Sequence, residues 1–316
     1  MANSIKSDVK NARKCENIND PIDTYVVDYI AMAFSKLFIK LHIIPNVVTV
    51  LSGLVGVAGG VLLCFDSLVT DIAGVLLIIL SAVFDASDGQ VARLTKHYSN
   101  LGRTLDGFAD FLVYLSIYVA VCVRLFPVNI PFTQTPWSFW IIPVAAVALF
   151  VFGAQARAAD YFKNLHMFMF TRGNGSELTR TRDIDRQISE CKKPSFERFR
   201  LKAYRSYTKM QESKTPEVQK LLDKIETGGS GVSPALYDEF LAKSDKYVRS
   251  TNLLTFNLRT IVLFILLFLP SHLEYLYFPF VIFVLEPVRF AIIAKYERLA
   301  SRLAESDLFG ISDRDE

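Results

Sequence analysis

Four aspartates carry the clearest chemical signal in this sequence. Asp85 and Asp88 are three residues apart, and Asp106 and Asp110 are four residues apart. Residues at these spacings share one face of a helix, so two helices joined by a short turn can aim all four carboxylates at one another. At the edge of a low-dielectric region these carboxylates would repel one another. Divalent cations relieve that repulsion.

The residues around the aspartates suit a bound diphosphate. Carboxylate oxygens favour Mg²⁺ or Mn²⁺, and four carboxylates suffice for two metals about 4 Å apart that would clamp a diphosphate. Gly89 and Gly102 leave room for a ligand beside the backbone. Arg93, eight residues after Asp85, lies on nearly the same face and could pair with a phosphate oxygen. The alternative is salt bridges of the first two aspartates with Arg93 and Arg103, but the joint pattern favours a ligand site.

The composition predicts a membrane protein. Of 316 residues, 51% are hydrophobic and 21% charged, with a net charge of +3 and a mean hydropathy of +0.29. These values exclude a disordered chain and leave no electrostatic footprint for binding nucleic acid. Four scattered cysteines suggest neither a zinc site nor a disulfide framework. Charges are absent from Leu41–Phe65 and from Leu125–Ala156, and about 20 apolar residues suffice to cross a bilayer.

The placement of basic residues predicts six spans. The expected spans are 45–66, 70–95, 100–123, 137–162, 252–270 and 274–297. Connections rich in Lys and Arg alternate with connections poor in them, as the positive-inside rule requires when both termini are cytoplasmic. The expected fold is therefore an all-α bundle of six transmembrane helices with its aspartates open to the cytoplasm.

The six expected spans divide the chain into five regions. They are a cytoplasmic N-terminus with an interfacial helix (1–44), four spans that contain the motif 85–110 (45–163), a cytoplasmic insertion (164–250), two further spans (251–297) and a cytoplasmic tail (298–316). Asp28–Lys40 is predicted as the amphipathic interfacial helix. Packing of that helix on the bundle is the alternative reading.

The insertion 164–250 is basic, with 17 basic and 12 acidic residues. Within it an apolar stripe recurs at helical spacing among arginines and lysines. The stripe consists of Phe196, Phe199, Ala203, Tyr207 and Met210. Such a helix suits an anionic membrane surface and equally suits docking on the protein's own cytoplasmic face.

The aspartate stretch resembles the signature of the CDP-alcohol phosphotransferase family, D-x2-D-G-x2-A-R-x8-G-x3-D-x3-D. Every position matches, through Asp85, Asp88, Gly89, Ala92, Arg93, Gly102, Asp106 and Asp110. Pro45-Asn46 with Thr49 resembles a further short element of this family, P-N-x-x-T. The resemblance implies six transmembrane helices, cytoplasmic termini and a homodimer. It does not explain the insertion, which is longer than the family's usual connection.

The resemblance also implies a role for each matched residue. Asp85, Asp88 and Asp106 would bind the metals, with Asp110 as a further ligand and the general base. Contacts to the cytidine nucleotide would come from Asp85, Gly89, Ala92, Arg93 and Gly102. The implied reaction is attack of an alcohol on the β-phosphorus of a CDP-linked donor, with release of CMP.

The resemblance determines the reaction class more closely than it determines the donor and acceptor substrates. Enzymes with this signature either move phosphatidyl from CDP-diacylglycerol to a polar alcohol, or move phosphocholine or phosphoethanolamine from a CDP ester to diacylglycerol. Six spans favour the first group, with inositol phosphate ahead of glycerol phosphate and serine. Candidate contacts to a phosphorylated acceptor are Arg103, Arg157, Arg259 and Arg289, although an arginine near a span end can also snorkel to the interface.

Two other classes of membrane protein also use acidic residues. A transporter with an intramembrane acidic site is the distant alternative, but the sequence has no inverted repeat. A membrane prenyltransferase would need a second aspartate-rich motif and more spans. Neither alternative explains the complete aspartate pattern.

Overall fold

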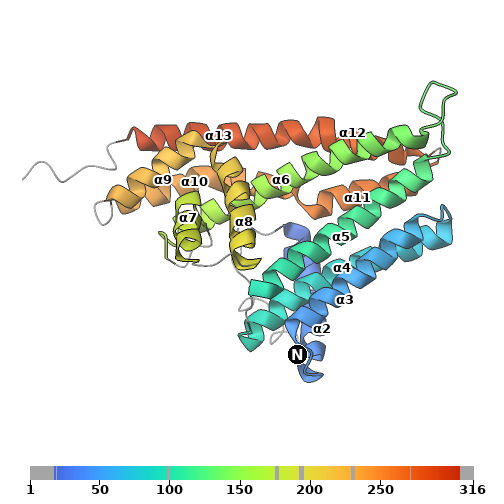
Figure 1. The fold of residues 1–316 in the computed structure, drawn as a ribbon, viewed down its shortest axis with the longest axis horizontal. Coiled ribbons are helices and arrows are strands. Elements are labelled where there is room, and N and C mark those ends of the chain that lie inside the picture. Colours follow the sequence, from blue (N-terminus) through green and yellow to red (C-terminus); the bar gives the residue numbers. More distant parts are fainter. Residues whose placement is uncertain are drawn as a thin grey trace, which may run out of the picture. The chain divides into compact units, whose positions relative to one another are not determined.

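The computed structural model describes residues 18, 20–97, 100–174, 178–191, 196–228, 232–270 and 272–306, and it describes no side chain at 100, 101, 103, 196 or 197. Throughout these ranges the secondary structure is helical, without a β-strand (Figure 1). The chain divides into two compact units. The first unit comprises Met1–Val151 and Asn257–Ile282, and the second comprises Phe152–Phe256 and Phe283–Glu316.

The first unit is built around three long helices that follow one another in the chain. These are α3 (Pro45–Leu63), α4 (Leu68–Thr95) and α5 (Asn100–Leu125). Pro45 begins α3, where the missing N–H costs no helical hydrogen bond. Lys96 ends α4 in the left-handed conformation, with φ of 55°, and the chain enters α5 four residues later. The two aspartate-bearing helices thus end and begin within the predicted connection 96–100, of which residues 98 and 99 lie outside the described residues.

Glycines allow α3 to approach both of its neighbours. A Cβ at Gly53 would lie 3.1 Å from the Cβ of Ala109 on α5, and one at Gly59 would lie 2.8 Å from the carbonyl oxygen of Gly74 on α4. Small residues at a helix–helix contact let membrane helices pack backbone to backbone. The glycines thus bring α4 and α5, and with them the aspartates, against the same helix.

Replacing Gly60 with Ala should destabilise the first unit by about 1–3 kcal/mol, the usual cost of overpacking a core. A Cβ at Gly60 would lie 2.6 Å from the Cβ and 3.0 Å from the carbonyl carbon of Ser116 on α5, so the two helices must separate. The free energy of unfolding in mixed micelles measures the effect. Gly107→Ala is the matched control, because nothing lies within 4 Å of a Cβ there. Equal stability of the two variants would contradict the close packing.

A buried ion-pair cluster ties the other ends of these helices together. Arg124, in the last turn of α5, pairs with Asp66 at 2.7 Å, Asp71 at 2.6 Å and Glu274 at 2.8 Å. Glu274 lies in η5 (Leu273–Leu276), a 3-10 helix that leads into α12 (Tyr277–Pro279). Arg124 is the one basic residue in the third connection of the predicted topology, and its charge is compensated inside the protein.

The second unit contains the remainder of α6 (Ile141–Phe170), four helices of the insertion and α13 (Glu286–Ala304). The insertion helices are α7 (Thr181–Glu190), α8 (Phe196–Glu212), α9 (Pro216–Gly228) and α10 (Pro234–Ser250). Helix α9 packs along α13, and the carboxylate of Glu297 on α13 accepts hydrogen bonds from the backbone N–H groups of Glu217 and Val218 at 3.0 and 3.1 Å. These bonds satisfy donors that the first turn of a helix leaves unpaired.

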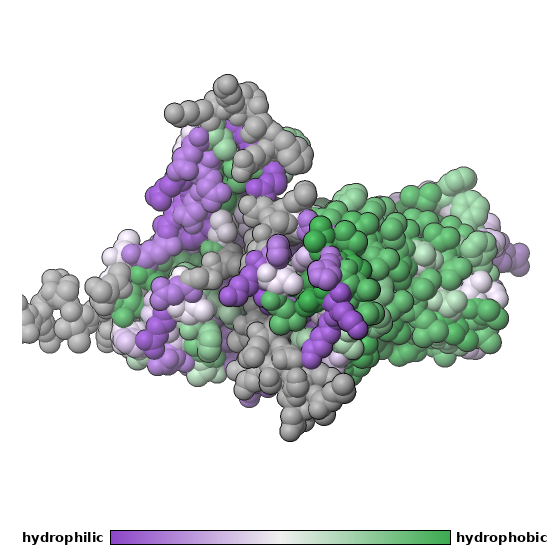
Figure 2. Space-filling view, turned by 90° about the horizontal axis from the view of Figure 1, so that it is seen from below, coloured by the Kyte–Doolittle hydropathy of each residue, from purple (hydrophilic) through white to green (hydrophobic). Residues whose placement is uncertain are grey.

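Within the part of the chain that the structure describes, five helical segments are long and apolar enough to cross a membrane. They are Pro45–Phe65, Leu68–Thr95, Thr104–Leu125, Ser138–Phe170 and Leu273–Ala304. Their exposed residues include Leu54, Val69 and Leu76, and apolar side chains of this kind form the green surface in Figure 2. An apolar exterior of this extent indicates a multi-pass integral membrane protein.

The fifth predicted span, 252–270, is shorter than expected. Helix α11 covers only Phe256–Leu267, and a sixth span arises only if α11 and Pro234–Leu254 together form one bent span. The helix is interrupted at Thr255, which has extended backbone and whose side chain donates to the carbonyl of Asn252 at 2.7 Å. Such side-chain bonds compete with helical hydrogen bonds. The structure thus gives five to six candidate spans.

Helix α2 (Asp28–Lys40) packs on α4 in the first unit. The Ser35 hydroxyl donates to Gln90 Oε1 at 3.0 Å, and the Phe34 and Phe38 rings contact Phe84 edge-on. Packing of this helix on the bundle, the alternative reading of its sequence, is therefore present. Its position at the membrane interface stays a prediction.

Helix α8 buries a different face from the predicted apolar stripe. Leu201 and Thr208 are buried, whereas Phe199 is 70% exposed and Met210 is 41% exposed. Ala203 is also exposed, Tyr207 is half-buried, and the side chain of Phe196 lies outside the described residues.

Candidate active site

The structure brings three of the four aspartates together. Carboxylate oxygens of Asp85 and Asp88 on α4 and of Asp106 on α5 all lie within 4.8 Å of one another. Asp110, one turn after Asp106, is not part of this group, and its side chain is exposed. The sequence predicts four convergent carboxylates. In the structure three of the four form a compact group, and the fourth, Asp110, lies on α5, the helix that also carries Asp106.

Local contacts hold this group in place. Asp88 is 8% exposed and accepts a short hydrogen bond from the Thr49 hydroxyl of α3. In the sequence Thr49 belongs only to the short P-N-x-x-T element, and its bond to a site carboxylate depends on the packing of α3 against α4. The helix that supplies Thr49 is also the one that glycines bring close to α4 and α5.

The donor set of the group fits a hard divalent cation. Asp85 Oδ1 is buried and has no hydrogen-bond partner among the described residues, and an unsatisfied buried carboxylate oxygen costs free energy unless a cation or a donor binds it. All the converging ligand atoms are carboxylate oxygens, the type that Mg²⁺ and Mn²⁺ prefer. Asp85, Asp88 and Asp106 are therefore suited to holding such a metal.

The other motif residues flank the three aspartates on the same two helices. Gly89, Ala92 and Arg93 follow Asp88 on α4. A Cβ at Gly89 would lie 3.1 Å from Nη1 of Arg93, so the guanidinium lies across the space that this glycine leaves. Gly102 is in the first turn of α5, and the side chain of Arg103 lies outside the described residues.

The other candidate arginines are divided between the two units. Arg259 on α11 is 1% exposed in the first unit, near the hydroxyl groups of Tyr114, Tyr118 and Tyr277. Arg157 on α6 and Arg289 on α13 line one pocket of the second unit.

A second set of possible ligands lies in the first unit. Asp66, His272 and Glu274 also bring ligand atoms within 4.8 Å of one another. Asp66 and Glu274 are each ion-paired with Arg124, however, so a guanidinium already provides the positive charge that a metal would supply to this set.

The part of the chain that contains the aspartates is similar to a known protein family. Residues 42–172 match the family described as CDP-alcohol phosphatidyltransferase. The match includes all the motif residues and ends at residue 172, within the first part of the insertion 164–250. A comparison with curated proteins finds no match.

Family and geometry agree on the class of protein. Members of this family typically depend on a divalent metal, and the matched residues include the group of three carboxylates. An enzyme of this family transfers a phosphatidyl group from a CDP-alcohol, which sets the transporter and prenyltransferase alternatives aside. The match of residues 42–172 to the CDP-alcohol phosphatidyltransferase family indicates that this protein is a phosphotransferase enzyme.

Proposed function

We propose that this protein transfers a phosphatidyl group from CDP-diacylglycerol to a polar alcohol and releases CMP. The observation that carries the proposal is the group of three carboxylates, which α4 and α5 bring within 4.8 Å inside the matched residues. A CDP-linked lipid is the substrate class for which such a site is suited, since its diphosphate needs its negative charge stabilised when the bond between the two phosphates breaks.

Asp85, Asp88 and Asp106 would hold Mg²⁺ or Mn²⁺, and two ions would suit the donor set when Asp110 joins as a further ligand. When bound, the metal supplies charge stabilisation to the diphosphate and to the leaving phosphate. The unsatisfied Oδ1 of Asp85 supports this assignment.

Asp110 would act as the general base. It accepts the proton of the acceptor hydroxyl, whose oxygen forms a new bond to the β-phosphorus of CDP-diacylglycerol. The bond from that phosphorus to the oxygen of the CMP phosphate breaks, and CMP leaves with the electron pair. The exposed side chain of Asp110 supports this role, because an incoming alcohol must reach it.

The nucleotide would lie along the helix faces that continue from the aspartates. Asp85, Gly89, Ala92, Arg93 and Gly102 are the proposed contacts. The absence of a Cβ at Gly89 lets the Arg93 guanidinium lie close to the helix there, which supports pairing of this guanidinium with a phosphate oxygen of the nucleotide.

The acceptor is proposed to carry a phosphate, with inositol phosphate as the favoured compound. Arg157, Arg259 and Arg289 are the proposed contacts on the described part of the chain. Two of them, Arg157 and Arg289, line one pocket, which supports recognition of an anionic group.

The arrangement in the membrane is also proposed. Both termini, the insertion 164–250 and the catalytic aspartates are assigned to the cytoplasmic side, and the protein is proposed to form a homodimer. The alternation of basic-rich and basic-poor connections in the sequence supports the sidedness.

A screen of acceptors tests the proposed reaction. Purified protein with Mn²⁺ and CDP-diacylglycerol should release CMP when given inositol 1-phosphate, glycerol 3-phosphate or serine, and the acceptor with the highest kcat/KM identifies the substrate. Chelation of the metal should abolish the release. CMP release from CDP-ethanolamine plus diacylglycerol, but not from CDP-diacylglycerol, would overturn the proposal in favour of a choline- or ethanolamine-type enzyme.

A further inference from the structure

A pocket in the second unit gathers basic side chains from three segments of the chain. It is lined by Arg157 of α6, Lys214 of the turn between α8 and α9, and Arg289 of α13, and no residue that lines it is acidic. Arg289 is paired with Glu286 through two hydrogen bonds, one of them from Nε at 3.0 Å. Arg157 and Lys214 form no ion pair with the described part of the chain. Three cations against one carboxylate leave an excess of two positive charges.

The environment of Lys214 is predominantly basic. Partial burial disfavours the ammonium group, the guanidinium groups of Arg289 and Arg157 repel it, and the attraction of Glu286 offsets these effects only in part, so the pKa of Lys214 lies below that of an ordinary lysine. The Lys214 side chain is exposed, whereas Arg289 is 4% exposed. Lys214 therefore lies where a soluble anion can enter, with Arg289 deeper in the pocket.

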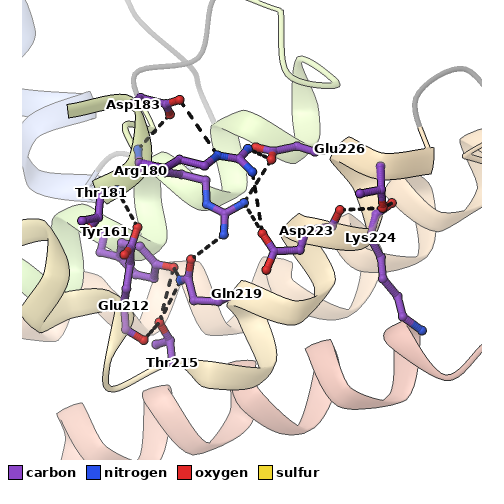
Figure 3. Close-up of polar contacts among 12 residues, drawn as sticks. Tyr161, Arg180, Thr181, Asp183, Glu212, Thr215, Gln219, Asp223, Lys224 and Glu226 are labelled. Carbon is purple, nitrogen blue, oxygen red and sulfur yellow. Dashed lines mark hydrogen bonds and ion pairs between the residues drawn. The ribbon is translucent and has the colours of Figure 1, made fainter. Parts of the chain in front are cut away.

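The turn that carries Lys214 is anchored on both sides. Gln211, before the turn, donates to the carbonyl oxygen of Arg157 at 3.0 Å. After it, Gln219 and Thr215 donate to the hydroxyl of Tyr161 on α6 at 2.7 and 3.4 Å (Figure 3). The ammonium group is thus carried by a turn whose backbone is fixed against the helix that supplies Arg157.

A wider polar network holds the insertion helices that flank this turn. Arg180, before α7, donates to Gln219 Oε1 at 3.3 Å and pairs with Asp223 at 2.7 Å, both on α9 (Figure 3). The backbone N–H of Thr181 donates to Glu212 of α8 at 2.8 Å. These bonds connect α7 to α8 and α9, the two helices on either side of the Lys214 turn, and so help to fix the position of that turn.

We propose that the insertion completes a pocket for a phosphate monoester and that Lys214 is the residue that makes the pocket select a phosphorylated ligand. A phosphate monoester carries about −1.5 to −2 charges at pH 7, which matches the excess of two positive charges. Arginine and lysine donors together suit its several acceptor oxygens. The ligand is a phosphorylated alcohol or the monoester headgroup of phosphatidic acid, and its identification with the acceptor rests on the proposed function.

Calorimetric titration of the full-length protein tests the pocket. In nanodiscs of phosphatidylcholine, inositol 1-phosphate should bind, and inositol, which lacks the phosphate, should bind at least about 10-fold more weakly. Lys214→Met should weaken the binding of inositol 1-phosphate by about 10-fold or more, and Lys214→Arg should retain most of it. In the CMP-release assay Lys214→Met should raise KM for the phosphorylated acceptor with little change in kcat.

The matched control is Lys220→Met, which removes an exposed lysine of α9 that pairs with Glu217 and does not line the pocket. Equal binding by Lys214→Met and the unchanged protein would overturn the proposal. Competition by phosphatidic acid in the nanodisc, without binding of any soluble monoester, would support the pocket but overturn its assignment to the acceptor. Intact binding of inositol 1-phosphate without CMP release from any acceptor would instead overturn the proposed function and leave the pocket in place.

Discussion

Replacing Asp110 with Asn should lower kcat for CMP release by about 100-fold or more, the usual effect of losing a general base. Asparagine keeps the size of the side chain but cannot accept the proton of the acceptor hydroxyl. Asp110 lies outside the group of three close carboxylates, so a Mn²⁺ ion held by Asp85, Asp88 and Asp106 should still bind to the variant, and weaker binding at the further ligand position should be overcome at saturating Mn²⁺. The loss that remains at saturating Mn²⁺ is therefore expected in kcat.

Two further variants distinguish the loss of a general base from the loss of a metal ligand and from the loss of an unrelated aspartate. Asp85→Asn removes a carboxylate of the close group and should weaken Mn²⁺ binding as well as activity. Asp238→Asn changes an aspartate on α10 whose side chain is 70% exposed, and it should leave both quantities unchanged. Full activity of Asp110→Asn at saturating Mn²⁺ would remove Asp110 from the role of base.

The aspartate site could be predicted because it depends on local spacing. Asp85 and Asp88 share a face of one helix, Asp106 and Asp110 share a face of the next, and Lys96 ends the first helix in a conformation that permits a short turn. The spacing of residues along a helix does not specify the distances between the carboxylates. The side-chain distances that separate Asp110 from the other three depend on how α4 and α5 pack against the glycines of α3.

Charge placement predicted the membrane-crossing segments better than the ends of the helices. Helix α6 continues to Phe170, beyond the predicted limit at 162, because Leu165 and Met169 are buried and extend its packed face. The fifth span fails as a single helix at Thr255, where a side-chain hydrogen bond replaces a helical one. Charge marks where a helix leaves an apolar environment, whereas helix ends depend on packing and capping.

The pocket proposed for the insertion could not be predicted from the sequence because it depends on contacts between distant residues. Lys214 is one of 17 basic residues between 164 and 250, and nothing in its sequence neighbours distinguishes it. It becomes distinct only when Gln219 and Tyr161, which are far apart in the chain, fix its turn beside Arg157. A basic segment can suit a membrane, a partner or a ligand, and tertiary contacts decide among these.

Replacing Arg124 with Met should destabilise the protein by about 3–5 kcal/mol, the usual cost of removing one partner from a buried ion pair. The side chains of Asp71 and Glu274 are 6% and 1% exposed, so neither carboxylate can recover its hydration in place. Unfolding in mixed micelles measures the loss. Arg172→Met is the control, because its pair with Asp238 is exposed on both sides and should contribute at most about 1 kcal/mol.

A double-mutant cycle separates the charge effect of Arg124→Met from its packing effect. Glu274→Gln removes one of the carboxylates that Arg124→Met leaves buried without a cation, so the double variant should be more stable than the sum of the two single losses predicts. A purely steric role for Arg124 would give additive losses instead. Loss of stability no larger than that of Arg172→Met would show that the cluster does not hold the ends of α4, α5 and η5 together. The positive result would explain why the predicted outer side of the bundle retains one arginine: its charge serves three buried or half-buried acids rather than the membrane topology.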